Sequence, residues 1–175
     1  MNSLGILLMK SVGAGYSALN IAGRSSQISV LEFAPLGQQS HLLVQGKYQD
    51  IQNFIIGLRT SDISRSLVLE NVTDALLQNY VGQNTAHFQE FALVFESYFI
   101  GDLFQYALEF FGLGLKIVDF RMQRMTGSPS FLVMTGTDSE SIKSYAQDLK
   151  RENIQITFIS SLSEGFRQYL DYKAE

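Results

Sequence analysis

Two kinds of hydrophobic spacing alternate along the first half of the chain. Leu4–Met9 is a short apolar run typical of a buried strand, and Ile28–Phe33 alternates apolar with polar residues as a half-buried strand does. Between them, small and apolar residues in Gly13–Arg24 recur at the spacing of one buried helix face. The other predicted elements of this half are strands at His41–Gln45 and Leu67–Leu69, helices at Tyr48–Leu58 and Ala75–Val81 with Thr73 as N-cap, and a turn at Pro35–Gln39.

The second half predicts the same elements in the same order. Its predicted strands and helices are Ala92–Phe95, Asp102–Phe111, Lys116–Phe120, Phe131–Met134, a helix from Asp138 or Ser139 to Lys150, Ile156–Ile159, and a helix that begins at Ser163 and Glu164. A turn is predicted at Met125–Pro129, before the third strand.

Matching positions in the two halves lie 90 residues apart. Gly46 and Gly136 end the third strand of each half, and Thr73-Asp74 and Ser163-Glu164 begin the last helix. Gln78 and Gln168 share the same shift. We therefore expect an α/β (α+β) protein made by tandem duplication of a βαββαβ unit plus a helix, with domains 1–86 and 87–175 and a linker at 83–87.

Composition excludes several classes of function. Hydrophobic residues make up 46% of the 175 residues, so each half has enough apolar residues for a small core. The net charge of −4 argues against a nucleic-acid partner, and the lack of cysteine excludes disulfides and thiolate metal sites. No apolar stretch reaches the ~20 residues of a membrane helix, so we expect a cytoplasmic protein without a membrane or metal partner.

The sharpest local motif is Gly13–Ala18, which fits the G-x-G-x-x-G/A pattern of dinucleotide-binding proteins. It follows a strand and opens a helix, and Glu32 ends the next strand, where a ribose-binding acid would lie. However, a second strand rather than a crossover helix is predicted after Phe33, and the second half lacks these glycines. We favour the interpretation that small residues here allow close packing of helix on sheet.

Other polar residues are weaker candidates. His41 and His87 have no nucleophile or acid beside them in sequence, so a structural or surface role is favoured over catalysis. Among the acids Glu96, Asp102 and Glu109, we interpret Asp102 as a first-turn acid favoured by the helix dipole and Glu109 as solvated.

Two arginines and a set of aromatic residues are candidates for surface interactions. Arg121 and Arg124 precede a turn and could attract anions, although a solvated surface is the simpler interpretation. The dense aromatic set predicts core and, in its surplus, a subunit interface; it comprises Phe91, Phe95, Tyr98, Phe99, Phe104, Tyr106, Phe110 and Phe111.

Several stretches of the first half match one family's pattern. Leu4–Leu7 followed by Lys10 is similar to an opening strand that reads L-G-x-I-E-x-K, and Ile28–Leu31 is similar to a strand of the N-V-E-L type. Val44–Gly46 is similar to a V-x-G segment before the second helix. The alanines Ala14, Ala18 and Ala22 correspond to an Ala-rich first helix, and Arg24 to the lysine of a K-A-A motif.

The second half matches the same pattern at Ala92–Ser97 and at Met134–Asp138. On these residues each half resembles a bacterial microcompartment shell domain, and the whole chain resembles the tandem-domain type. That resemblance implies a homotrimer that imitates a hexamer, with Arg24 at the ring edge.

The resemblance also implies pore loops between the second and third strands of each half. They would be Leu36, Gly37, Gln38 and Gln39 in the first half, and Thr126, Gly127, Ser128 and Pro129 in the second. Two departures concern the ring edge: Gly112 or Leu113 stands where the second half should have its lysine, and Asn71-Val72 and Ser161-Leu162 replace a P-R-P-like segment. Flat-sheet tiling is therefore less expected than ring formation.

The resulting expectation is a non-enzymatic shell component without cofactor or metal. Its pore would pass small metabolites, its partners would be its own copies and other shell proteins, and its location would be a microcompartment in the cytoplasm. Two alternatives remain: a tandem ferredoxin-like module that binds an amino acid near Gly13–Gly15 or Gly37, and a dinucleotide-binding enzyme that uses Gly13–Ala18.

Overall fold

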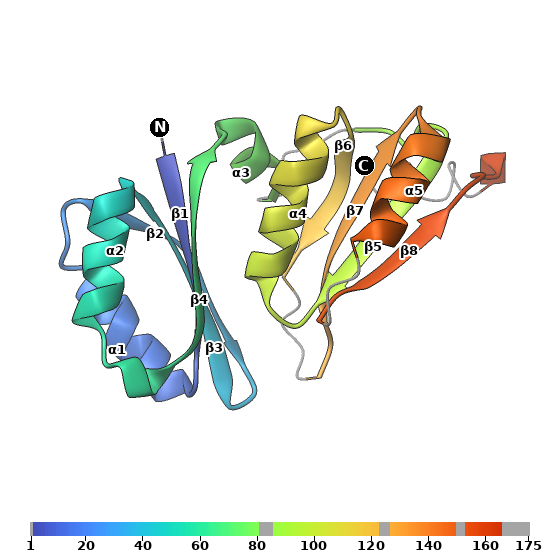
Figure 1. Cartoon of the computed structure of the whole chain (residues 1–175). Helices are drawn as coiled ribbons and strands as arrows, with labels where there is room; N and C mark the ends of the chain where they lie inside the picture. The colour runs from blue at the N-terminus through green and yellow to red at the C-terminus, as the bar shows by residue number, and fades with distance from the viewer. Residues whose placement is uncertain (1, 81–85, 123–126, 150–152, 166–175) are drawn as a thin grey trace. The chain divides into compact units, whose positions relative to one another are not determined.

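The computed structural model describes residues 2–80, 86–122, 127–149 and 153–165 (Figure 1). They form two compact units, the first made mainly of residues 1–74 and the second mainly of 75–123 and 129–165. The helix that follows the first sheet therefore groups with the second unit. The boundary that we expect between residues 86 and 87 stays a prediction.

The first unit is an antiparallel sheet with its strands in the order β2-β3-β1-β4. Helices α1 and α2 lie along one face of this sheet (Figure 1). Its elements are β1 (Asn2–Met9), α1 (Val12–Ala22), β2 (Ile28–Leu36), β3 (Gln39–Gly46), α2 (Tyr48–Gly57), the short 3-10 helix η1 (Thr60–Asp62) and β4 (Ile63–Val72).

Helix α1 forms where the sequence provides an N-cap and a face of small residues. The Ser11 hydroxyl accepts a hydrogen bond of 3.0 Å from the backbone N–H of Ala14, which satisfies one of the free donors of the first turn. Gly15, Ala18 and Ala22 form the buried face, so the helix axis can approach the sheet closely. The core beneath α1 and α2 comprises Leu7, Met9, Ala18, Ala22, Ile28, Leu42, Val44, Ile51, Phe54 and Leu58.

The second unit repeats this architecture with the strand order β6-β7-β5-β8. Its core is aromatic where that of the first unit is mainly aliphatic: Phe95, Tyr106 and Phe110 pack with ring centroids 5.1 to 6.3 Å apart. The elements are α3 (Asp74–Tyr80), β5 (Phe91–Ser97), α4 (Ile100–Gly112), β6 (Lys116–Arg121), β7 (Ser130–Gly136), α5 (Ser139–Asp148) and β8 (Gln155–Ile159).

The two sheets share an irregularity as well as their strand order. The β2–β3 pairing shifts register between Val30 and Glu32, and the β6–β7 pairing shifts between Ile117 and Asp119. A bulge at the same place in both sheets is the kind of feature that a duplicated fold retains. The predicted fold class, a tandem βαββαβ-plus-helix arrangement, is confirmed by these sheets and by the helices between their strands.

Several element boundaries differ from the predicted ones. The turn predicted over Pro35–Gln39 consists of Gly37 and Gln38 alone, because Leu36 pairs with Gln39 and Pro35 with Ser40. Pro35 is tolerated there because β2 is an edge strand and needs no second partner for its backbone. Strand β4 extends well beyond Leu67–Leu69, and α4 begins two residues before Asp102.

The aromatic surplus lies mostly in the core. Of the set named above, only Tyr98 and Phe111 have side chains exposed by a third or more, at 68% and 36%. The Glu164–Gly165 pair is helical, as predicted for the start of the last helix, and residues 166–175 lie outside the described part.

Candidate functional site

The β2–β3 turn is held against the start of α1. Gly37 has a φ of 61°, the left-handed conformation that glycine adopts without strain at the first position of a two-residue hairpin turn. The backbone N–H of Val12 donates to the Gln38 carbonyl at 3.1 Å, and the Ser40 hydroxyl donates to the Ser11 carbonyl at 3.2 Å. This turn is therefore a fixed projection with exposed amide side chains at Gln38 and Gln39.

The corresponding turn of the second repeat also contains a glycine, although Gly127 and Ser128 group with the first unit. Gly127, 90 residues after Gly37, has a φ of 81° and is followed by the irregular residues Ser128 and Pro129. Thr126 and Arg124 lie outside the described residues. Arg121 forms an exposed ion pair with Asp119, 2.8 Å from Nε to Oδ1, so its charge is partly balanced before the turn begins.

Gly15 confirms the packing interpretation of the Gly13–Ala18 motif. A β-carbon on Gly15 would collide with the Ser40 hydroxyl and lie 2.8 Å from the Phe33 ring, whereas one on Gly13 would meet only the Ser11 hydroxyl at 3.9 Å. Every strand pairing in the first sheet is antiparallel, unlike the parallel sheet of a dinucleotide-binding fold. Helix–sheet contact explains the second glycine, and the sheet does not support the enzyme alternative.

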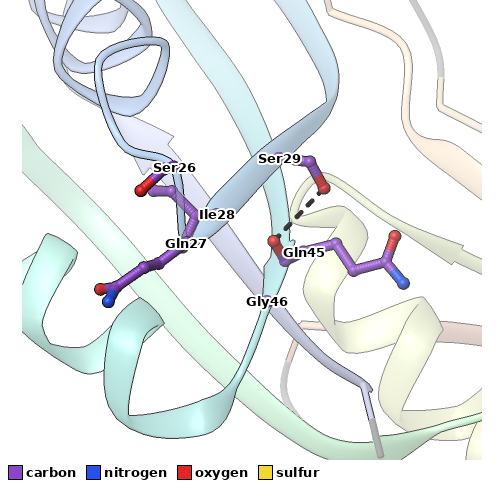
Figure 2. A pocket seen from close by; sticks show the side chains of 6 residues that line it. All are labelled: Ser26, Gln27, Ile28, Ser29, Gln45 and Gly46. Carbon is purple, nitrogen blue, oxygen red and sulfur yellow. Dashed lines mark hydrogen bonds between the residues drawn. The ribbon is translucent and has the colours of Figure 1, made fainter.

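An open hollow of about 340 Å³ lies where β2 begins and β3 ends. Figure 2 shows its lining, which is neutral and mainly polar: Ser26, Gln27, Ile28, Ser29, Gln45 and Gly46. The Ser29 hydroxyl donates to the Gln45 carbonyl at 3.4 Å across it, as the dashed line marks. The lining offers hydroxyls and amides but no group that titrates near neutral pH, so it suits contact rather than acid–base chemistry.

Arg24 lies two residues before this hollow. It is exposed, and its backbone N–H donates to the Ile21 carbonyl at 3.2 Å beyond the end of α1. A cation at this position is favoured by the carbonyl end of the helix. In the second unit α4 ends at Gly112, and Leu113 follows with 52% of its side chain exposed.

His41 is fully buried in β3 between Leu8 of β1 and Ala34 of β2. Burial lowers the pKa of His41 from 6.5 to about 4, because the charged imidazolium loses its hydration. The imidazole is therefore neutral at physiological pH. Burial in the sheet fits the structural role favoured from sequence, whereas His87 is exposed.

Two of the acidic candidates, Asp102 and Glu109, accept hydrogen bonds from hydroxyl groups. Asp102 lies in the first turn of α4, as predicted, and accepts a hydrogen bond of 3.0 Å from the Ser97 hydroxyl, which itself accepts from the backbone N–H of Phe99 at 3.1 Å. Glu109, interpreted as solvated, is half-buried and accepts an exposed hydrogen bond from the Tyr145 hydroxyl. In the described part of the chain, no three His, Asp or Glu side chains gather to hold a metal ion.

Tyr80 makes a packing contact that the sequence pattern does not predict. Tyr80 of α3 packs on two rings of the second unit, 4.8 Å from Phe104 and 5.1 Å from Phe120 between centroids. Tyr16 and Phe33 occupy the positions of Phe104 and Phe120 in the first unit, so the aromatic pair is repeated, but the sequence has no local signal for its contact with Tyr80.

The described residues thus define a class of fold: two antiparallel four-stranded sheets of one topology, each with its own crossing helices. A helix long and apolar enough to span a membrane is not found among these residues. No protein-family model and no curated protein sequence matches the chain.

Solved structures do match it. A microcompartments protein from Desulfitobacterium hafniense DCB superposes with a TM-score of 0.80, at 20% identity, over 96% of this chain and 99% of its own. At this identity the match shows a shared fold. The small subunit of acetolactate synthase from Thermotoga maritima also aligns, at 13% identity over 93% of this chain and 95% of its own, but its TM-score of 0.29 is too low to support an argument.

Proposed function

We propose that the chain is a structural shell component of a bacterial microcompartment, which assembles as a homotrimer with a pseudohexameric ring. The observation that carries this proposal is the shared fold with the D. hafniense microcompartments protein across both units. The match spans 96% of this chain and 99% of that protein, which supports a proposal for the whole chain rather than for one domain.

The geometry of the two sheets supports a closed ring. Within the described residues, β2, β4, β6 and β8 each pair with one other strand, so each sheet has two edge strands. Edges of this kind are usually covered or joined in native assemblies, and a ring of six similar units covers them without leaving an open end. Three chains with two repeats each supply the six units.

The proposed axial pore is lined by the two glycine turns. Gly37 and Gly127 allow backbone to approach a symmetry axis closely, and exposed Gln38 and Gln39 place neutral polar groups beside it. Such a lining would admit small polar metabolites and slow apolar ones. Other shell proteins of the same compartment are the proposed partners at the ring edge, where Arg24 is exposed.

Light scattering coupled to size-exclusion chromatography tests the ring. The expected mass is three times that of the 175-residue chain, and negative-stain images should show discs with a central depression. A monomer at micromolar concentration would contradict both the trimer and the shell role, whatever the fold.

A ligand-binding regulatory module is the second candidate. The strand order β2-β3-β1-β4 with helices on one face is the ferredoxin-like arrangement that such modules also use. Thermal denaturation with a panel of amino acids distinguishes the two. A saturable rise in melting temperature in a monomer or dimer would favour the module, and no shift in a trimer would favour the shell role.

A further inference from the structure

The second unit contains an aromatic pair that is covered by a helix from the end of the first repeat. Phe104 of α4 and Phe120 of β6 lie 4.6 Å apart between ring centroids with an interplanar angle of 55°. Tyr80 of α3 packs on both rings. All three side chains are buried: Phe104 is 0% exposed, Phe120 2% and Tyr80 7%. The pair is therefore a docking place that α3 fills.

The first unit has the same pair at the corresponding positions. Tyr16 is the fifth residue of α1, as Phe104 is of α4, and Phe33 pairs with Leu42 as Phe120 pairs with Leu132, 90 residues later. The rings of Tyr16 and Phe33 lie 4.8 Å apart at 57°, nearly the geometry of the second pair. The duplication has thus preserved the docking place as well as the sheet.

The first pair is more exposed than the second pair, which Tyr80 covers. Tyr16 is 56% exposed and Phe33 is half-buried, whereas Phe104 and Phe120 are buried. A large exposed aromatic residue beside a second ring is a typical anchor for a partner.

The sequence itself supplies a segment that repeats α3. Residues 163–175 follow β8 as α3 follows β4, and the 90-residue shift that relates Gln78 to Gln168 places Leu170 at the position of Tyr80. Phe166, Tyr169 and Leu170 have the i, i+3, i+4 spacing of an apolar helix face. If the last helix of each repeat docks on the aromatic pair of the following repeat, residues 163–175 would dock on the first unit of another chain.

We infer that residues 163–175 of one copy dock on the Tyr16–Phe33 pair of a second copy, with Leu170 in the place of Tyr80. The contact joins copies head to tail, and such a heterologous contact closes into a ring when its rotation divides a full turn. The inference deepens the proposed ring and rests on it only for closure, because the docking itself follows from the repeated aromatic pair.

Cross-linking between chains tests the contact, and the natural absence of cysteine makes every introduced thiol unique. Ser17→Cys places a thiol beside Tyr16 without removing the ring, and Asp171→Cys places one beside Leu170. The two single-cysteine variants are co-expressed and treated with a short bis-maleimide. Asn53→Cys, exposed on α2 of the same unit, replaces Ser17→Cys in the matched control.

The expected product is a linked pair at twice the chain mass from the Ser17→Cys and Asp171→Cys mixture, and a clear loss of that product in the control. In one chain that carries both cysteines, linkage should give multiples of the chain mass. A product that runs only at the single-chain mass would overturn the inference, since the contact would then be intramolecular. A trimer by light scattering without the linked pair would overturn the docking but leave the ring, and a monomer would overturn both.

A second pair of variants separates docking from folding. Leu170→Glu should dissociate the oligomer while the circular dichroism spectrum and the melting cooperativity of each chain persist. Gln168→Glu introduces the same group on the opposite side of a helix from Phe166, Tyr169 and Leu170 and should leave the oligomer intact. If both variants stay associated, the segment does not carry the contact and the inference fails.

Discussion

Gly15 and Ser40 lie so close together that no side chain fits on residue 15. The Ser40 hydroxyl occupies the space of a β-carbon at Gly15, and the same hydroxyl donates a hydrogen bond of 3.2 Å to the carbonyl of Ser11. One short contact therefore fixes how far α1 stands from β3 and holds the β2–β3 turn beside the helix start.

Gly15→Ala is expected to lower the free energy of unfolding by about 1–3 kcal/mol, because either α1 must move away or Ser40 must give up its hydrogen bond. Better helix propensity recovers at most about 1 kcal/mol of that loss. Urea denaturation monitored by circular dichroism measures the change.

Gly13→Ala is the matched control, since a β-carbon there meets nothing closer than 3.9 Å. Its unfolding free energy should stay the same or rise by up to about 1 kcal/mol. Equal losses in both variants would mean that the helix start needs glycine for its backbone, and the close-packing explanation of Gly15 would be wrong.

The repeat could be predicted from sequence because its markers are local. Gly46 and Gly136 end strands for a steric reason that each half repeats: a β-carbon at Gly46 would lie 2.9 Å from the Gln27 carbonyl, and one at Gly136 3.2 Å from the Phe91 ring. A helix is predicted to start at Asp138 or Ser139, and Asp138 is its N-cap, with the carboxylate accepting from the Ser141 N–H at 3.2 Å. Such signals depend on a few neighbouring residues and can be read along the chain.

The docking of α3 could not be predicted in that way. Tyr80 packs on Phe104 and Phe120, which follow it by 24 and 40 residues. No local pattern in α3 predicts that its tyrosine contacts these two rings. The edge position of β2 was likewise hidden, so Pro35 was interpreted as part of a turn. Contacts between residues far apart in the chain determine both the docking of α3 and the edge position of β2. Such contacts cannot be predicted directly from a single sequence.

The buried imidazole of His41 should make stability depend on pH. Its folded pKa of about 4 lies below the ordinary 6.5, so the unfolded chain binds the proton more readily between these values. Stability from this group is complete above pH 6.5 and falls as the pH drops toward 4, by about 3 kcal/mol in all. His41→Gln should flatten this part of the curve of unfolding free energy against pH.

The readout is the difference between urea midpoints at neutral pH and near pH 4.5, which a general loss of stability in the variant does not alter. His87→Gln, at an exposed residue, should retain the full wild-type difference. A wild-type slope in His41→Gln would show that carboxyl groups, rather than this histidine, cause the acid sensitivity.

Arg24→Ala is expected to weaken contacts between rings without altering the ring. The side chain is exposed beyond the end of α1, so its removal should change the unfolding free energy by no more than about 0.5 kcal/mol. Electron microscopy at increasing protein concentration should show fewer ordered arrays than the wild type. Arg59→Ala, exposed after α2, is the control for a simple change in net charge. A large loss of stability with unchanged arrays would make Arg24 a residue of the fold instead.

The glycine turns should lie closest to the three-fold axis of the proposed trimer. Gly37 and Gly127 both adopt positive φ values, and the turn at Gly37 is fixed to α1 through the hydrogen bond from Val12 to Gln38, so this projection keeps its shape without a neighbour. The exposed ion pair with Asp119 partly balances the charge of Arg121, so backbone N–H groups and the amides of the first turn should give a polar, weakly electropositive lining. Cryo-electron microscopy of the ring measures this directly: the Cα atoms of both glycines should be nearer the axis than that of Tyr48, an exposed residue at the start of α2.

Gln38→Cys gives an independent check, because thiols gathered around an axis should be joined between chains by a bis-maleimide, whereas Tyr48→Cys thiols should stay separate. If the turns lie on the outer rim, or if the two variants cross-link equally, these residues do not form a pore.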